Sequence, residues 1–209
     1  LSEWTIMPEP YTMIEVTTEY REDDYQYLTG ELSGRACCLQ HTPTDFKVVL
    51  ADLALTQNTV LIARKDNRVT GIAVVYKHDD SSYINELFAD NEAVRAQLLY
   101  RAGLRNGTER IILQLPPVES LPSVPLGMAR IIDARAVLQL YAAGCPEVEM
   151  NIELTDEQLS VNNGYYYLCK GKCMTSEVRL PGVHTRMTIA ELSEKILDEM
   201  QPYMSLMMN

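Results

Sequence analysis

The strongest helical pattern in the sequence begins at residue 42. The stretch Thr42-Pro43-Thr44-Asp45 offers an N-cap, a proline at the first helical position and an acid three residues after the cap. Apolar residues then recur at the i, i+3, i+4, i+7 spacing of one helix face: Phe46, Val49, Leu50 and Leu53. This pattern predicts a helix. A more polar helix is predicted ahead of it, over 22–32, and Gly34 ends it.

The next stretch carries the pattern of strands. Two β-branched runs, 58–64 and 69–78, are separated by the polar turn 65–68, which predicts a hairpin. The remaining elements predicted up to residue 115 are a strand over 82–88, a helix from its cap at Asp90 to about residue 104, and a strand over 110–115. Pro116-Pro117 ends that last strand.

Prolines and serines between Val118 and Gly127 indicate a domain boundary. Beyond it the pattern predicts a strand over 128–132, a helix capped by Asp133, a strand over 147–154, a turn at Asn162-Asn163-Gly164, strands over 165–168 and 175–180, and a helix from its cap at Thr188 to about residue 200. We therefore expect a leading linker over 1–12, one domain over 13–118 and a second over 119–209.

Composition narrows the class of protein. The 209 residues carry 18 Lys and Arg against 29 Asp and Glu, and the net charge of −11 repels a phosphate backbone, so a nucleic-acid partner is not expected. No apolar run reaches membrane-spanning length, and residues 1–10 lack the features of a secretory signal. Five cysteines, an odd number, favour free thiols over a disulfide framework. These features predict a cytoplasmic protein without a membrane partner.

Other candidate chemistry finds little support in the sequence. Cys37, Cys38 and His41, and the pair Cys169-x3-Cys173, fit no zinc spacing, so structural thiols and no metal site are expected. The sequence contains no G-x-S-x-G nucleophile elbow, so a hydrolase activity gains no positive support. Glu147, Glu149 and Glu153 alternate with apolar residues as on a solvent-facing strand, and His78 and His184 are expected at the surface or in turns. Among Tyr165, Tyr166 and Tyr167, which alternate between faces, at least one should be exposed, as at an interface.

The order helix, helix, hairpin, strand, helix, strand over 22–115 resembles a GNAT acetyltransferase domain. That family cradles the pyrophosphate of acetyl-CoA on a Gln/Arg-x-x-Gly-x-Gly/Ala loop before the long helix. The corresponding residues here, 89–93, contain no glycine. The acids Asp90 and Glu92 would each oppose a pyrophosphate by on the order of 1 kcal/mol. We therefore predict no cofactor site in this domain, with Asp90 acting only as a helix cap.

The whole chain from about Pro10 resembles one GNAT subgroup, the enhanced intracellular survival type. The resemblance lies in 69–76 with Ile84-Asn85-Glu86-Leu87 for the first domain, and in 128–133 with 162–166 for the second. It implies an α+β fold in which a degenerate, GNAT-like mixed sheet with flanking helices is followed by a small sterol carrier protein-like α+β domain.

The resemblance also implies a function. The parent enzyme would move the acetyl group of acetyl-CoA to an amine, with its acid, a tyrosine, in a catalytic first GNAT domain absent from this chain. The start at Leu1 rather than at a methionine is interpreted as the point where that first domain was removed. The terminal carboxylate, on Asn209 here, would reach that domain's site as base or substrate anchor. The apolar tail 201–209 suits that role, although it could equally pack on its own domain.

Three functions follow for the chain. The first is the scaffolding and substrate-side portion of such an N-acetyltransferase, which is expected to be inactive alone and to have a second copy of itself, in a homo-oligomer, among its candidate partners. The second is a carrier of lipid or another apolar ligand, which the scarcity of large aliphatic residues in the second domain argues against. The third is an interaction module without a small ligand.

Overall fold

The computed structural model of the chain describes residues 12–35, 37–114, 128–200 and 202–204. These residues fall into two compact units. The first unit comprises residues 1–123 together with 202–209, and the second comprises 124–201. The chain therefore leaves the first unit, forms the second and returns, so that the described residues 202–204 belong to the first.

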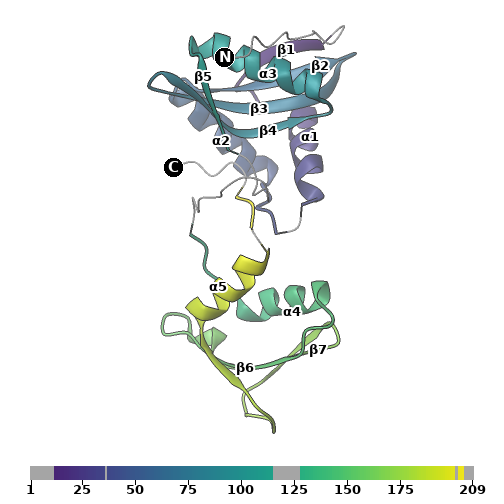
Figure 1. Ribbon diagram of the computed structural model, residues 1–209, viewed down its shortest axis with the longest axis vertical. Coiled ribbons are helices and arrows are strands. Elements are labelled where there is room, and N and C mark those ends of the chain that lie inside the picture. The colour runs from purple at the N-terminus through teal and green to yellow at the C-terminus, as the bar shows by residue number, and fades with distance from the viewer. Residues whose placement is uncertain (1–11, 36, 115–127, 201, 205–209) are drawn as a thin grey trace. The chain divides into compact units, whose positions relative to one another are not determined.

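The first unit is built on a five-stranded mixed sheet with the strand order β1-β2-β3-β4-β5. Its strands are β1 (Thr12–Thr17), β2 (Thr59–Lys65), β3 (Arg68–His78), β4 (Ser81–Ala89) and β5 (Arg110–Leu113), and its helices are α1 (Glu22–Ser33), α2 (Pro43–Leu55) and α3 (Glu92–Asn106). Neighbouring strands are antiparallel except β4 and β5, which run parallel. Helices α1 and α2 cover one face of the sheet and α3 covers the other (Figure 1).

The helices on both faces explain why β2 is buried along almost its whole length. Val60 and Ile62 pack with α1 and α2, whereas Leu61 and Ala63 pack with α3. Alternate side chains of a strand point to opposite faces, so the β2 side chains on both faces are buried beneath helices. The predicted capping box of α2 is present: Thr42 Oγ1 accepts a hydrogen bond from the Asp45 amide at 3.2 Å, and the Asp45 carboxylate accepts one from the Thr42 amide at 2.9 Å.

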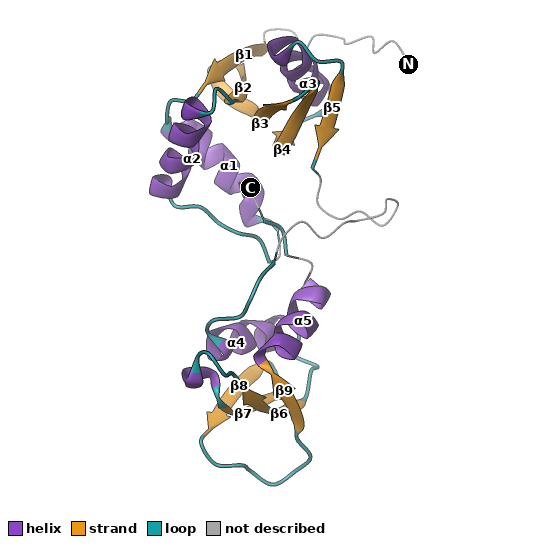
Figure 2. Ribbon diagram, turned by 90° about the vertical axis from the view of Figure 1, so that its left-hand side faces the viewer, coloured by secondary structure: helices purple, strands orange, loops and turns teal. Residues whose placement is uncertain are grey.

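The second unit has a four-stranded sheet with the order β8-β7-β6-β9. Its elements are α4 (Ala134–Gly144), β6 (Met150–Thr155), the short 3-10 helix η1 (Ser160–Asn162), β7 (Gly164–Cys169), β8 (Lys172–Ser176), β9 (Thr185–Thr188) and α5 (Ile189–Met200). Helices α4 and α5 lie on the same face of this sheet (Figure 2). Their core with the sheet includes Leu138, Ile152, Leu154, Leu192 and Ile196.

Several local predictions for the second unit are wrong. Residues 128–132 form no strand, β6 begins at 150 rather than 147, and the expected strand over 175–180 is β8, which lies at 172–176. The predicted turn at Asn162-Asn163-Gly164 does lie in the connection between the antiparallel strands β6 and β7, where η1 forms part of it, and a second, tight turn lies at Lys170-Gly171, where both φ angles are positive (49° and 75°). The Asn162 side chain is buried, where it accepts a hydrogen bond from the Ala134 amide at 3.0 Å and donates one to Asp156 at 2.9 Å.

The mixed α+β class with flanking helices is confirmed for the chain. Across the described ranges, none of the helices combines the length and the apolar character needed to cross a membrane.

Candidate functional site

The first sheet pairs β4 with β5 over a short stretch only. The two strands pair only between Ser81–Ile84 and Arg110–Leu113, with one further hydrogen bond from the Gln114 amide to the Ile84 carbonyl at 3.0 Å. At the same point β4 carries a β-bulge, because Val75 pairs with Ile84 and Val74 pairs with Glu86, which leaves Asn85 as the extra residue. A bulge re-aims the side chains that follow it.

The bulge places Glu86 on the face of the sheet that Phe88 shares with α1 and α2, whereas Leu87 packs on the α3 side. Glu86 is 1% exposed, so its carboxylate lies out of water. Burying an ionised carboxylate is costly unless donors surround it. The Tyr203 hydroxyl supplies one such donor through a short hydrogen bond to Glu86 Oε1.

Tyr203 is held by its backbone as well. Its amide donates to the Cys37 carbonyl at 2.9 Å, and its own carbonyl accepts from the Leu39 amide at 3.0 Å, so the chain near its C-terminal end forms a parallel bridge with the connection between α1 and α2. Burial first, and then the charge of Glu86, raise the pKa of the Tyr203 hydroxyl far above its usual range. Tyr203 is therefore a neutral donor at physiological pH.

Arg35 completes this cluster. Its guanidinium carbon lies 4.8 Å from the centroid of the Tyr203 ring and 5.2 Å from that of Phe88, so the cation stacks on both aromatic rings. We call Arg35, Glu86, Phe88 and Tyr203 the tail anchor. Burial raises the pKa of the neighbouring Cys38 thiol, with Glu86 adding to the effect, so that thiol is a poor nucleophile.

The N-terminus of α3 is the second notable part of the first unit. Asn91, not the predicted Asp90, is the N-cap: its Oδ1 accepts from the Val94 amide at 2.9 Å and its carbonyl from the Arg95 amide at 3.0 Å. Asp90 instead extends the pairing of β4 with β3, because its amide donates a hydrogen bond to the Thr70 carbonyl at 2.9 Å. Its carboxylate accepts a hydrogen bond from the Tyr27 hydroxyl at 3.0 Å.

This helix start is also pressed close to the sheet. A Cβ added at Gly71 on β3 would lie 2.9 Å from Val94 Cγ1 and 3.0 Å from the Phe88 carbonyl oxygen. The acid Glu92 occupies the first turn of α3. A helix N-terminus binds an anion through free amides and a favourable dipole. Here the Asn91 side chain accepts the hydrogen bond of the Val94 amide, so that amide is not free for a ligand. The carboxylates of Asp90 and Glu92 at the same helix start would repel a bound anion.

A third cluster joins β1, α1 and β2. The Arg64 side chain, 7% exposed, bonds Glu15, Asp23 and Asp24. Arg64 holds the pKa of Asp23 below its usual range, whereas burial raises the pKa of Asp24 to about 6 against the opposing pull of Arg64. Asp24 Oδ2 is buried without a hydrogen-bond partner. The arrangement ties the edge strand β1 to α1 and serves the fold.

In the second unit, Asp156 organises the connection between β6 and β7. Burial opposes its charge, but hydrogen bonds from Asn162, the amides of Leu159 and Gln158, and Arg130 outweigh burial and lower the pKa of Asp156 to about 2. This network fixes the segment before α4 and carries no free reactive group.

The sequence-predicted candidates are dispersed. Cys37 and Cys38 lie beside Tyr203, and Cys173 packs against the core of the second unit. All five cysteines are free thiols. In the ranges that the structure describes, no three His, Cys, Asp or Glu residues come together as metal ligands. The expectation of an exposed tyrosine at 165–167 is wrong, because Tyr166 and Tyr167 are buried and Tyr165 is half-buried. Asn209 lies outside the described residues.

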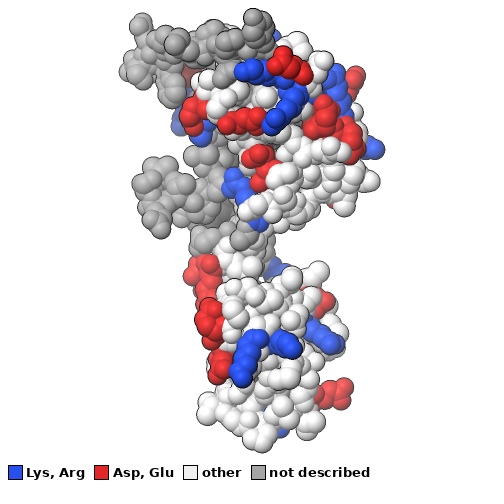
Figure 3. Space-filling view, turned by 90° about the vertical axis from the view of Figure 1, so that its right-hand side faces the viewer, with Lys and Arg blue, Asp and Glu red and all other residues white. Residues whose placement is uncertain are grey.

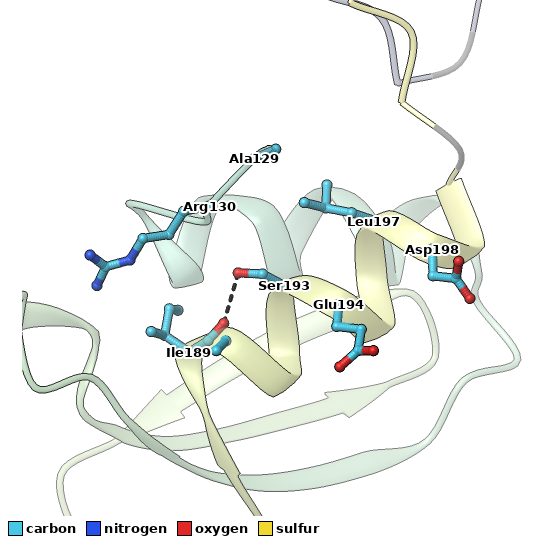
Figure 4. Close-up of a pocket in the computed structure, with 8 residues that line it drawn as sticks. Ala129, Arg130, Ile189, Ser193, Glu194, Leu197 and Asp198 are labelled. Atoms are coloured by element: carbon cyan, nitrogen blue, oxygen red, sulfur yellow. Dashed lines mark hydrogen bonds between the residues drawn. The ribbon is translucent and has the colours of Figure 1, made fainter. Parts of the chain in front are cut away.

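The second unit carries a groove of about 490 Å³ between α5 and residues 129–130. Its apolar lining comes from Ala129, Ile189 and Leu197, and three charged residues, Arg130, Glu194 and Asp198, also line it (Figure 4). Charged side chains around an open groove do not provide the apolar enclosure that a lipid requires. The alternative of an apolar-ligand carrier therefore gains no support from this groove.

Comparison with solved structures identifies the fold. The chain is similar to a GCN5-related N-acetyltransferase from Anabaena variabilis (13% identity, TM-score 0.55, covering 94% of this chain and 63% of that one). It is similar to Eis1 from Mycobacterium abscessus (13%, 0.53, 90% and 52%). It is also similar to a probable N-acyltransferase from Enterococcus faecalis (14%, 0.58, 88% and 51%).

These likenesses show a GNAT-like fold, and the chain spans only about half to three-fifths of the length of those structures. No protein-family model and no curated protein sequence matches the chain.

Proposed function

We propose that this chain is the scaffolding and substrate-side part of an acetyl-CoA-dependent N-acetyltransferase of the enhanced intracellular survival type. In this proposal the first unit is a degenerate second GNAT domain and the second unit is the sterol carrier protein-like domain. A preceding GNAT domain would bind acetyl-CoA and hold the tyrosine acid. The observation that carries the proposal is the α3 N-terminus, which combines an Asn91 cap with Asp90 and Glu92 where a GNAT enzyme needs free amides for a pyrophosphate.

The tail anchor suggests how the chain would contribute to the reaction. Acetyl transfer to an amine requires a base that removes the ammonium proton before the amine attacks the thioester. We assign this role, or that of substrate anchor, to the terminal carboxylate of Asn209. Tyr203 is fixed on the first unit. The six residues that follow Tyr203, ending at Asn209, can span at most about 20 Å. The anchor would thus limit where that carboxylate can act.

Calorimetry with acetyl-CoA tests the first part of the proposal on the chain as it stands. We expect no saturable heat, because neither acid at the α3 start tolerates a pyrophosphate. A dissociation constant in the micromolar range, or acetylation of an amine by this chain alone, would contradict it.

The second part is tested in a polypeptide that carries the catalytic GNAT domain ahead of this chain. Removal of Asn209 shifts the terminal carboxylate by one residue and should lower kcat by about a hundredfold. Asn209→Ala is the matched control: it keeps a terminal carboxylate at the same position and should retain most of the activity. Equal activity of the shortened and full-length enzymes would refute the role of the carboxylate while leaving the first part intact.

A further inference from the structure

Two adjacent cysteines, Cys37 and Cys38, lie where the C-terminal segment 202–204 is tied to the first unit. The Cys37 carbonyl accepts from the Tyr203 amide at 2.9 Å, and the Leu39 amide donates to the Tyr203 carbonyl at 3.0 Å. These two hydrogen bonds flank Cys38, which pairs with Tyr203 in a parallel bridge. The other three cysteines of the sequence belong to the second unit. Within the first unit these two thiols can therefore form a disulfide only with each other.

The backbone at this point is strained. Cys37 has a φ angle of 47°, in the left-handed region that residues with a Cβ atom rarely adopt. Such a conformation persists only where the surrounding structure holds it. The hydrogen bond from the Tyr203 amide holds the Cys37 carbonyl directly. We therefore expect the connection between α1 and α2 to change its backbone conformation once segment 202–204 leaves.

A disulfide between neighbouring residues competes with the hydrogen bond of Tyr203. The bond closes a small ring that contains the peptide group joining Cys37 and Cys38. Disulfide-linked Cα atoms usually lie about 4.4–6.8 Å apart, whereas Cα atoms on either side of a trans peptide lie about 3.8 Å apart. The ring therefore closes only if this peptide group changes its geometry. The carbonyl that accepts from Tyr203 belongs to the same peptide group, so its hydrogen bond is lost.

The thiols are protected while segment 202–204 is bound. Burial raises the pKa of both Cys37 and Cys38, and the thiolate is the form that reacts. Both side chains are half-buried, and Cys38 packs beside Tyr203 against the core beneath α1 and α2. Departure of Tyr203 removes part of this cover, which brings the thiol pKa values back toward their ordinary range. Oxidation therefore proceeds from the state in which segment 202–204 is released.

We propose that Cys37 and Cys38 form a reversible disulfide that releases segment 202–204 from the first unit. One cysteine thiolate attacks a low-molecular-weight disulfide, breaks its S–S bond and expels one thiolate. The neighbouring thiolate then attacks the protein sulfur of this mixed disulfide, forms the Cys37–Cys38 bond and expels the second thiolate. The protein gives up two protons and two electrons, and the external disulfide takes them up as two thiols. The strained bond is easily reduced again, and the switch does not depend on the function proposed above.

Peptide mass and hydrogen exchange, measured on the whole chain, test this switch. The net charge is −11, and acidic side chains gather along one margin of the second unit (Figure 3), so the oxidant is the uncharged bis(hydroxyethyl) disulfide. Trypsin, cutting after Arg35 and Lys47, isolates both thiols in one peptide. That peptide should lose two hydrogens and carry no oxidant. The Leu39 and Tyr203 amides should exchange at least about tenfold faster, and a reducing agent should restore their rates.

The control is the double variant Cys37→Ser, Cys38→Ser, in which the oxidant should leave both exchange rates unchanged. Three results in the wild type would overturn the proposal: a peptide that stays reduced, a peptide that carries the oxidant, or an internal disulfide with unchanged exchange at Leu39 and Tyr203. Accelerated exchange in the oxidised double variant would overturn it as well.

Thermodynamic linkage supplies a second test. If the disulfide weakens binding of segment 202–204, loss of that binding must favour the disulfide by the same factor. At a fixed thiol concentration, Tyr203→Ala should therefore form the bond at an oxidant concentration at least about tenfold lower than the wild type needs. Leu98→Ala is the matched control, because it weakens the same unit from the α3 side of the sheet, and it should need the wild-type concentration. Equal concentrations for Tyr203→Ala and the wild type would refute the coupling.

Discussion

The two sheets of this protein differ in what covers their second face. In the first unit helices lie on both faces, Asn91 caps α3, and Tyr203 bonds the buried Glu86. In the second unit one face carries helices and the other carries a hydrogen-bonded loop with its apolar side chains outward. These polar groups of the first unit are bonded within that unit, whereas the second unit leaves apolar side chains of one loop exposed.

The largest effects should come from breaking each core separately. Gly71→Val forces side-chain atoms against Val94 and the Phe88 carbonyl, so we expect the first unit to lose about 3 kcal/mol or more. Leu138→Ala leaves a cavity in the second unit and should cost about 2–5 kcal/mol there. Hydrogen exchange resolved by segment should show loss of protection in the altered unit only. Simultaneous loss in both units would refute their independence.

Removal of the tail anchor should weaken the first unit somewhat less. Tyr203→Ala leaves the buried Glu86 carboxylate without this donor and removes a ring from Arg35, for an expected loss of about 2–4 kcal/mol in urea unfolding. Tyr203→Phe keeps the ring and should cost about 1–2 kcal/mol. Tyr100→Phe, at an exposed position, serves as the control and should change little. A Tyr203→Ala protein as stable as the wild type would show that the tail anchor does not stabilise the first unit.

The Arg64 cluster predicts opposite pH dependences for two adjacent acids. The pKa of Asp24 is raised to about 6, so this carboxyl stabilises the fold below its unfolded pKa, and that contribution is lost as pH rises through about 6. Asp24→Asn should therefore increase stability by about 1–2 kcal/mol at pH 8, and by much less at pH 4.

Asp23 provides the matched comparison. Arg64 lowers the pKa of Asp23, so its contribution is present above its unfolded pKa and is lost as pH falls. Asp23→Asn should destabilise the chain at pH 8 and have little effect at low pH. Urea unfolding of both variants at the two pH values checks the signs, and two variants that shift stability in the same direction at pH 8 would contradict the assignment.

The smallest effect should be in the loop between β8 and β9, residues 177–184. Tyr167→Phe removes the hydroxyl that accepts from the Leu180 amide and contacts His184 Nε2, and should cost about 1 kcal/mol. We expect the Leu180 amide of this variant to exchange its hydrogen roughly tenfold faster than in the wild type. Tyr165→Phe, which keeps the ring packing on His184, should leave that rate unchanged. Unchanged exchange in Tyr167→Phe would mean that the loop is held by other contacts.

How well the sequence predicted these features depends on the distance over which they are encoded. The α2 capping box was predictable because Thr42 and Asp45 are three residues apart. The cap of α3 was displaced by one residue because a sheet hydrogen bond from Asp90 to Thr70 extends the preceding strand. The tail anchor joins Glu86 to Tyr203, which are 117 positions apart, so no local sequence pattern predicts it.

The second unit shows the same limit. The alternation of Tyr165, Tyr166 and Tyr167 correctly separates the two faces, yet exposure could not be predicted because the loop of residues 177–184 contacts Tyr167 and helps to bury it. Asn162 resembled a turn residue, but its side chain serves a buried network with Asp156 and the start of α4. Polar side chains that satisfy distant backbone groups leave no periodic signature.

The most direct test of the central proposal, that the α3 start of the first unit binds no acetyl-CoA, is an NMR titration with acetyl-CoA that follows the amides of α3. Val94 and Arg95 report on the helix start, because Asn91 accepts from both. The account predicts that their resonances stay unchanged up to about millimolar acetyl-CoA. Saturable shifts confined to residues 91–95, with micromolar affinity, would contradict it.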